Sequence, residues 1–158
     1  MHRFEVRSSI STFQPLVGSL NGSSGALNTV FSLPPVWGGV PDATGTGELL
    51  AGAAAACYLI TTQLAASREG IRLSKLDVRV EGDMAADAAG VRITELRLYP
   101  VIAVEGGQEE SERMRQLARS CSSQCVISKA IAGNVNYVLQ EPVMEACAMV
   151  PGHAEGEL

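Results

Sequence analysis

The stretch Glu48-Leu-Leu-Ala-Gly-Ala-Ala-Ala-Ala-Cys57-Tyr58 decides the fold of this chain, because it lies in a long run without charge. No charged residue occurs between Leu49 and Ala66. A helix that is apolar on nearly every side must be covered on every side. We therefore expect a buried central helix that begins near Thr46 or Gly47 and ends at about Ser67, with Gly70 as its breaker.

The same run reaches the length of a membrane span. It is rich in alanine and glycine, however, and it contains Thr61, Thr62 and Gln63, so its insertion into lipid would be weak. Strand-like segments follow it, and the chain has no second such run. The sequence therefore favours a core helix, and we expect no membrane partner.

Alternating apolar and polar residues predict strands around the helix, at 4–10, 26–33, 76–81, 91–104 and 135–139. The phase changes between Ile93 and Leu96, which predicts a bulge, and Pro100 predicts an edge or a break. Between the first two strands, Gly18 to Gly25 is turn-like, with Asn21-Gly22 as a hairpin signal.

A second helix is predicted from Glu109, because apolar residues recur there at helical spacing, namely Met114, Leu117, Ala118, Cys121 and Cys125. This order of strands and helices predicts an α+β domain. We expect one domain over residues 1–149 and a flexible tail over 150–158.

Composition narrows the function classes. Of the 158 residues 46% are hydrophobic but few are aromatic, so the core should consist of Ala, Val, Leu and Ile. The net charge of −5 argues against a nucleic-acid partner. The first residues carry charges and lack the apolar region of a secretory signal. Four cysteines in such a chain suggest a reducing compartment, and we expect a cytoplasmic protein.

The cysteines are the candidate reactive residues. Cys57 and Cys125 can form a redox pair if the fold brings their Cα atoms within about 7 Å; otherwise they are two small apolar residues of a core. Cys121 lies four residues before Cys125 and can be its partner instead, as a structural redox switch. Cys147 is interpreted as incidental. The two histidines, His2 and His153, lack ligand spacing, so we expect no metal.

Other chemistries lack their residues. Two terminal histidines do not support a Ser-His-Asp triad. Neither a phosphate-binding loop nor a dinucleotide fingerprint occurs, and we expect no cofactor.

Four segments in this order resemble the family of osmotically inducible protein C and the organic hydroperoxide resistance proteins (OsmC/Ohr-like). They are Phe31-Ser-Leu-Pro-Pro-Val-Trp-Gly38-Gly39, the Glu48–Tyr58 stretch, Val78-Arg-Val-Glu-Gly82, and Cys125-Val-Ile-Ser128 with Gly133-Asn134-Val135. The resemblance covers roughly residues 15–140.

The resemblance implies an intertwined homodimer in which sheets from both chains enclose two long helices. It also implies a peroxidase that reduces organic hydroperoxides in oxidative-stress defence. Cys57 matches the peroxidatic cysteine and Cys125 the resolving cysteine, and a dithiol reductant, usually lipoyl-bearing, would regenerate them. Glu48 lies next to the position of the family's catalytic glutamate.

Two positions depart from the family pattern. Leu20 stands where the family has an arginine, and Gly47 stands at the glutamate position, one residue before Glu48. Arg3 and Arg7 are candidate replacements for the missing positive charge. These departures keep a second interpretation open, in which the chain is a catalytically degenerate dimer that binds a small molecule or a partner.

Overall fold

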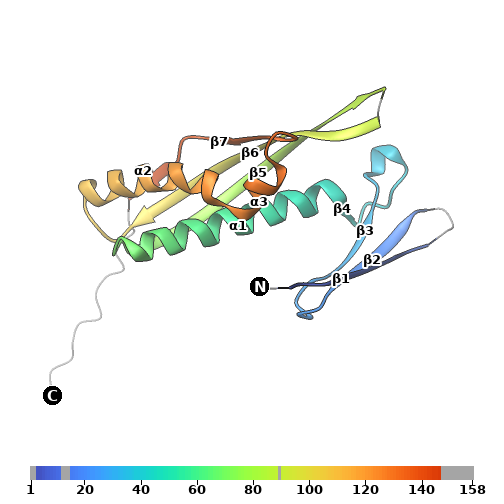
Figure 1. The fold of residues 1–158 in the computed structure, drawn as a ribbon, viewed down its shortest axis with the longest axis horizontal. Helices are drawn as coiled ribbons and strands as arrows, with labels where there is room; N and C mark the ends of the chain where they lie inside the picture. Colours follow the sequence, from blue (N-terminus) through green and yellow to red (C-terminus); the bar gives the residue numbers. More distant parts are fainter. Residues whose placement is uncertain (1–2, 12–14, 89, 147–158) are drawn as a thin grey trace, which may run out of the picture. The chain divides into compact units, whose positions relative to one another are not determined.

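In the computed structural model the chain forms two compact units, residues 1–53 and 54–158 (Figure 1). The structure describes residues 3–11, 15–88 and 90–146. Within them, two four-stranded sheets and a long helix make the fold α+β, as predicted. The tail predicted at 150–158 lies outside the described residues, and a single domain over 1–149 stays a prediction.

The first unit is built on a sheet of four strands in the order β1-β2-β3-β4. The strands are β1 (Val6–Ile10), β2 (Val17–Gly22), β3 (Asn28–Ser32) and the short β4 (Thr44–Gly45). The first three pair antiparallel, and β3 pairs with β4 in parallel. A 3-10 turn, η1 (Pro35–Trp37), lies between β3 and β4. The strands predicted at 4–10 and 26–33 are confirmed.

The turn predicted at Gly18 to Gly25 is wrong in its first half. Gly18 to Gly22 belong to β2, and the chain reverses only after Gly22, whose N–H donates to the carbonyl of Leu27 at 2.8 Å. Pairing with β1 on one side and β3 on the other outweighs the low strand propensity of glycine and asparagine. The Phe31 ring occupies the space that a side chain at Gly18 would need.

Helix α1 spans Thr46–Arg68 and runs from the first unit into the second, close to its predicted bounds. Gly70 follows it with a φ of 68°, the left-handed conformation that ends many helices. By length and composition alone, with a mean hydropathy of 1.6, α1 could cross a membrane. Core helices of soluble proteins have similar length and composition, and one stripe of α1 is buried within this chain.

The second unit contains a long antiparallel hairpin of β5 (Leu73–Asp87) and β6 (Gly90–Val104), which Figure 1 shows in green and yellow. Its register shifts where Asp83 pairs with Glu95 but Met84 pairs with Ile93. Thr94 is thus the extra residue of a bulge, within the predicted region. The expectation for Pro100 is wrong, because β6 is a central strand and continues through it.

Two short strands explain how β6 accommodates Pro100. β7 (Asn136–Leu139) pairs in parallel with Glu95 to Leu98, and β8 (Val143–Glu145) pairs with Val101 to Ala103. Pro100 lies where the first pairing has stopped and the second has not begun, so the ladder on this side requires no N–H from it. The last predicted strand is confirmed as β7, whereas β8 was not predicted.

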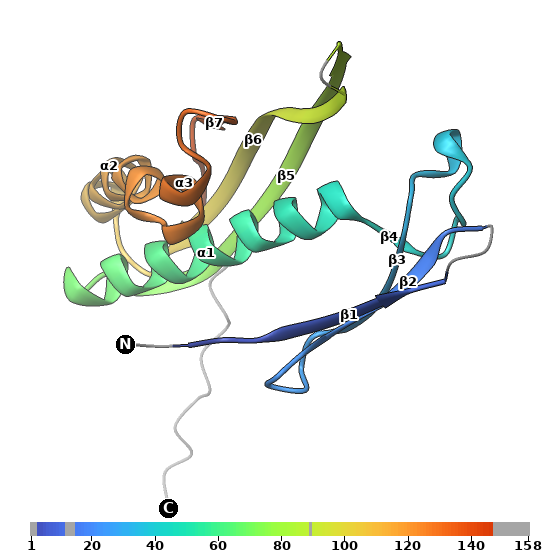
Figure 2. The same cartoon turned by 45° about the vertical axis from the view of Figure 1, so that its right-hand side comes forward.

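Two helices, α2 (Gln108–Gln124) and α3 (Val126–Ile131), precede β7. The predicted apolar stripe buries Met114, Ala118 and Cys121. Cys125 was predicted to continue this stripe, but it leaves the helix and separates α2 from α3. Figure 2 shows α1 and α2 along one face of the β5–β6 hairpin.

The core of the second unit lies between these helices and the hairpin. Among the described residues it includes one cluster around Ile102 and Met114 and another around Tyr58, Leu98 and Cys121. The residues are mainly aliphatic, as the composition predicts.

The opposite face of the sheet is charged. Arg97 contacts Asp83 and Glu95 at 2.5 Å each, and Glu95 also accepts a hydrogen bond from Asn136 at 2.6 Å. These contacts connect β5, β6 and β7, although ion pairs this exposed stabilise a fold only slightly.

Candidate active site

Cys57 and Cys125 form a disulfide in the second unit. Their Cα atoms are 5.8 Å apart, although the two residues are 68 positions apart in the sequence. This distance lies within the range that a disulfide requires, and it meets the condition set from the sequence. Cys125 is fully buried, whereas Cys57 is half-buried. The fold therefore brings together the two thiols that a redox reaction would need.

The position of Cys57 follows from the packing of α1. Its buried residues recur every four positions and are Ala54, Tyr58, Thr62 and Ala66. A residue next to this stripe is turned by about 100° from it, at the border between core and solvent. Cys57 immediately precedes Tyr58 and is held at that border. Cys57 is therefore half-buried.

Cys125 is positioned by the joint between α2 and α3. It is the C-cap of one helix and the N-cap of the next, with an extended backbone at φ −62° and ψ 136°. Its N–H donates to the carbonyl of Cys121, and its carbonyl accepts the N–H of Lys129, both at 3.2 Å. A single non-helical residue thus carries the sulfur at the junction.

Polar side chains are buried around Tyr58 and Cys121. The Tyr58 hydroxyl donates to the carbonyl of Ala118 at 3.3 Å. Burial raises the pKa of Tyr58 well above its usual value, and the neighbouring Thr62 hydroxyl opposes this only in part. Burial also raises the pKa of the free Cys121 thiol, against the weaker effect of the Thr62 and Ser120 hydroxyls. Cys121 is therefore held as a thiol.

Tyr137, like Thr62, has a buried hydroxyl without a hydrogen-bond partner among the described residues. Burial raises the pKa of Tyr137 to about 12. A buried polar group without a partner lowers stability, so Tyr137 is a candidate for improvement by substitution.

Glu48 lies in the first unit and caps the start of α1. Its carboxylate accepts the backbone N–H of Gly45 at 2.6 Å. A glutamate in the first turn that reaches back to the residue before the helix is half of a capping box. The contact gives Glu48 a structural task beside any chemical one.

The positions that depart from the family pattern are also in the first unit. Leu20 lies in the middle of β2, opposite Ser8 and Thr29. Arg7, a candidate replacement for the missing arginine, is exposed and pairs with Glu5 at 2.8 Å. Arg3 is exposed as well.

Sequence reasoning identified both cysteines but missed the joint that presents Cys125. The signal was Ser128, three residues after Cys125, because a serine at this spacing can bind backbone groups of a helix end. His2, His153 and Cys147 lie outside the described residues.

The fold and the paired cysteines define a class: an α+β protein with two sheets, a long apolar helix and a disulfide between that helix and a second helical segment. A profile of the family described as OsmC-like protein matches residues 39–140. The chain belongs to this family.

Known proteins are similar to the chain in sequence or in structure. The uncharacterized protein YmaD of Bacillus subtilis is 28% identical over 144 residues, which cover 90% of this chain and 95% of YmaD. A crystal structure named as an organic hydroperoxide resistance protein OsmC from Legionella pneumophila has a TM-score of 0.70 at 23% identity, covering 92% of this chain and 100% of that one.

The organic hydroperoxide resistance protein OhrB of Bacillus subtilis has a TM-score of 0.63 at 20% identity, covering 90% of this chain and 98% of the other. TM-scores of this size establish a shared fold, whereas sequence identities this low carry no activity over to this chain.

Two tyrosine substitutions should have opposite effects on stability at pH 7. Tyr137→Phe removes an unpaired buried hydroxyl, so we expect the free energy of unfolding to stay equal or to rise by up to about 1 kcal/mol. Tyr58→Phe removes a bonded hydroxyl and should lower it by about 1 kcal/mol. Urea denaturation of both variants measures these changes, and a marked loss for Tyr137→Phe would contradict the assignment.

The pH dependence adds a second readout. Folding raises the pKa of Tyr137 to about 12, above the unfolded value of about 10. Its titration therefore leaves the free energy of unfolding unchanged below pH 10 and lowers it as the pH rises from 10 toward 12, because the unfolded state ionises first. The advantage of Tyr137→Phe over the native protein should therefore grow between pH 10 and pH 12.

Proposed function

We propose that this protein is a thiol peroxidase that reduces organic hydroperoxides, with Cys57 as the peroxidatic and Cys125 as the resolving cysteine. The observation that carries the proposal is the Cys57–Cys125 disulfide, formed by a half-buried and a fully buried thiol. The substrate must reach a peroxidatic thiol, and a resolving thiol must lie close enough to form a disulfide with it. The family membership supports the same assignment.

The reaction has two steps in each oxidation. The Cys57 thiolate attacks the outer oxygen of the hydroperoxide, the O–O bond breaks, and the alkoxide takes a proton and leaves as the alcohol. Cys57 is then a sulfenic acid. The Cys125 sulfur attacks the Cys57 sulfur, and the hydroxyl group leaves with the Cys125 proton as water. The product is the observed disulfide.

An external dithiol completes the cycle. One of its sulfurs attacks the disulfide and releases one protein thiol. Its second sulfur then attacks the resulting mixed disulfide and releases the other protein thiol, so that two protons and two electrons pass to Cys57 and Cys125 and the reductant leaves as a disulfide. We propose a dithiol of the lipoyl type as this reductant. In a reducing cytoplasm, where we place the protein, a disulfide is more often catalytic than structural.

The surroundings of the disulfide favour an organic substrate. Val126, which follows Cys125 directly, is 73% exposed, and Ile60, three residues after Cys57 on α1, is 62% exposed. Exposed apolar side chains within one turn of each cysteine in the sequence support an alkyl or fatty-acid hydroperoxide over hydrogen peroxide, because contact with the hydrocarbon stabilises the complex.

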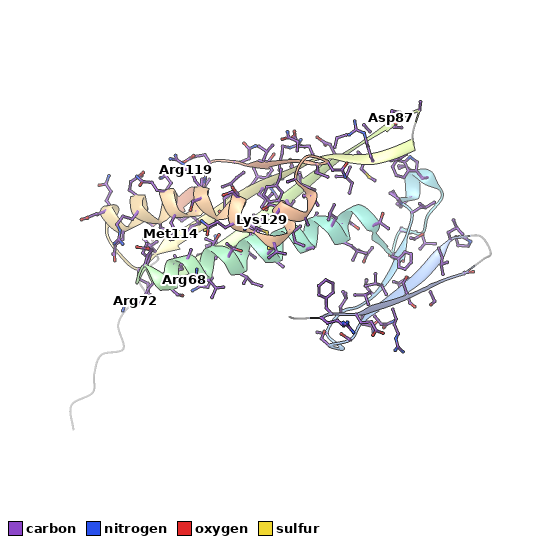
Figure 3. All side chains as sticks on the ribbon, viewed as in Figure 1. Arg68, Arg72, Asp87, Met114, Arg119 and Lys129 are labelled. Carbon is purple, nitrogen blue, oxygen red and sulfur yellow. A yellow bond between two sulfur atoms is a disulfide. The ribbon has the colours of Figure 1, made fainter. Side chains whose placement is uncertain are left out.

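A positive charge is needed to stabilise the Cys57 thiolate. The arginines of α2 are engaged, since Arg113, Arg115 and Arg119 pair with Glu69, Glu112 or Glu141. Lys129 of α3, labelled in Figure 3, makes no ion pair among the described residues and has its backbone N–H bonded to Cys125. We propose Lys129 as a source of this charge in place of the arginine that Leu20 replaces.

We also propose that the protein works as a homodimer. Opposite its buried stripe, α1 exposes Ile60 and Leu64, the latter at 52%. The first unit exposes further large apolar side chains, among them Phe4 at 81% and Val36 at 85%. Exposed apolar groups on this scale mark interaction surfaces. A second copy is the simplest cover, because two-fold dimers are the commonest oligomers.

A second candidate function is a dimer that keeps the fold and binds a small molecule or partner without peroxidase chemistry. Leu20 and Gly47 favour it, because they remove the charged groups of the family pattern. The occupied carboxylate of Glu48 adds to this, because that carboxylate already accepts the Gly45 N–H. The two candidates differ in the speed with which Cys57 reacts.

Substitution of Cys57 tests the peroxidase. Pre-reduced protein mixed with cumene hydroperoxide should form the Cys57–Cys125 disulfide rapidly, and Cys57→Ser should lower peroxide consumption by about a hundredfold or more, because the nucleophile is lost. Stopped-flow kinetics followed by mass mapping of the thiols measures both.

Two further variants complete this test. Cys125→Ser should react once and then accumulate overoxidised Cys57, whereas Cys121→Ala is the control that keeps full activity. Slow, unspecific oxidation of the native protein would support the degenerate binding protein instead, and a Cys121–Cys125 bond would support the structural switch.

Glu48 variants separate capping from catalysis. Glutamine can occupy the same capping position, so Glu48→Gln should keep the native stability. We expect it to slow Cys57 oxidation by about tenfold, because Glu48 is the carboxylate next to the position of the family's catalytic glutamate. Glu48→Ala should also lower the free energy of unfolding by about 1 kcal/mol. A Glu48→Gln variant as fast as native protein would leave Glu48 only the cap, and Glu109→Gln serves as the matched control.

Charged substitution on α1 tests the dimer. Leu64→Glu places a carboxylate on the exposed apolar face and should shift the protein from dimer to monomer in sedimentation velocity. Gln63→Glu, next to it in the sequence, is the control for added charge. A native protein that sediments as a monomer at micromolar concentration would overturn the proposed assembly.

A further inference from the structure

The position of Cys125 depends on one residue between two helices. Helix α2 ends at Gln124 and α3 begins at Val126, so the angle between the helices decides where the sulfur of Cys125 points. Disulfides tolerate only a narrow range of Cα and Cβ separations. Some interaction must therefore hold the two helices at a fixed angle.

Ser128 makes that interaction. Its hydroxyl lies 2.6 Å from the carbonyl oxygen of Ser122, in the last turn of α2, and 2.8 Å from that of Cys125. The residue is 8% exposed, so water does not replace these bonds readily. Among the described residues, no other side chain of α3 donates a hydrogen bond to α2. The single hydroxyl proton thus ties the start of α3 to the end of α2 across the cysteine.

We infer that Ser128 is a positioning residue for the resolving step: its hydroxyl fixes the α2–α3 joint so that the Cys125 sulfur stands ready to attack Cys57. This role in resolution rests on the proposed peroxidase function. The first oxidation, at Cys57 on α1, does not involve the joint. Loss of the hydroxyl should slow disulfide formation and leave the attack on peroxide unchanged.

The carbonyl of Ser122 explains why the bond matters. The last carbonyls of a helix have no partner within the helix, and a buried one must find another donor. The Cys125 N–H donates to the Cys121 carbonyl, and the Lys129 N–H donates to the Cys125 carbonyl. The Ser122 carbonyl accepts the hydrogen bond of the Ser128 hydroxyl. Without the hydroxyl, this carbonyl would turn toward water, and the joint would open.

Two isosteric substitutions isolate the hydroxyl. Ser128→Thr keeps it and Ser128→Val replaces it with a methyl group of the same shape, so their difference reports the hydrogen bond alone. Ser123→Ala is the matched control, because the Ser123 hydroxyl donates to the Ser120 carbonyl at 3.0 Å within α2 and does not bridge the joint. Circular dichroism verifies that each variant is folded.

The primary measurement needs no peroxide. In a glutathione redox buffer, oxidised glutathione and the two thiols exchange with the protein disulfide and two reduced glutathiones. The equilibrium, read by alkylation and peptide mapping of Cys57 and Cys125, gives the effective concentration of one thiol at the other. We expect Ser128→Val to lower it about fivefold to tenfold relative to Ser128→Thr, with Ser123→Ala unchanged.

A second measurement follows the reaction with cumene hydroperoxide. Ser128→Val should show a native rate of Cys57 oxidation, a longer-lived sulfenic acid trapped by dimedone, and more overoxidised Cys57. Equal effective concentrations in the Val and Thr variants would overturn the inference. A native protein inert to peroxide would remove the proposed function, yet the glutathione equilibrium would still decide whether Ser128 positions Cys125.

Discussion

The burial of one stripe of α1 is the constraint on which the rest of the second unit depends. Ala54, Tyr58, Thr62 and Ala66 recur at four-residue spacing and lie against the hairpin and α2. Tyr58 fixes the rotation of the helix, because its ring fills the core and its hydroxyl reaches the carbonyl of Ala118. Once this rotation is set, Cys57 has one direction open to it, along the border of the core. The packing of Tyr58 therefore sets the position of the neighbouring Cys57.

The second half of the site is built by an interruption rather than by a regular element. Cys125 would continue the apolar stripe of α2 if the helix went on, and it would then face the core as Cys121 does. The extended backbone at this residue ends α2, starts α3 and turns the sulfur toward α1. The thiol four residues earlier remains free and buried, with a raised pKa. Two cysteines on one helical face thus have different fates because only one of them leaves the helix.

The sequence predicts much of this architecture, and its failures have physical causes. The uncharged run predicts α1 to within a residue at each end, and the change of phase near Thr94 predicts the bulge in β6. Local patterns predict these features because they arise within one element. Pro100 and the Gly18–Gly22 segment were misjudged because neighbouring strands, which the sequence does not reveal, decide their conformation. The joint at Cys125 was missed because this cysteine keeps the helical spacing of the α2 stripe, and the signal for the joint, Ser128, lies three residues beyond it.

The two requirements of a thiol peroxidase are distributed differently along this chain. Pairing of the sulfurs requires geometry, and all the contacts that create it, from the α1 stripe to the Ser128 hydroxyl, belong to the second unit. Activation of the thiol requires charge, and the positions where the family pattern carries it, Leu20 and Gly47, belong to the first. A chain can therefore lose charge in its first unit without disturbing the disulfide. Formation of the Cys57–Cys125 disulfide therefore reports the geometry of the site, and the reactivity of reduced Cys57 reports its charge.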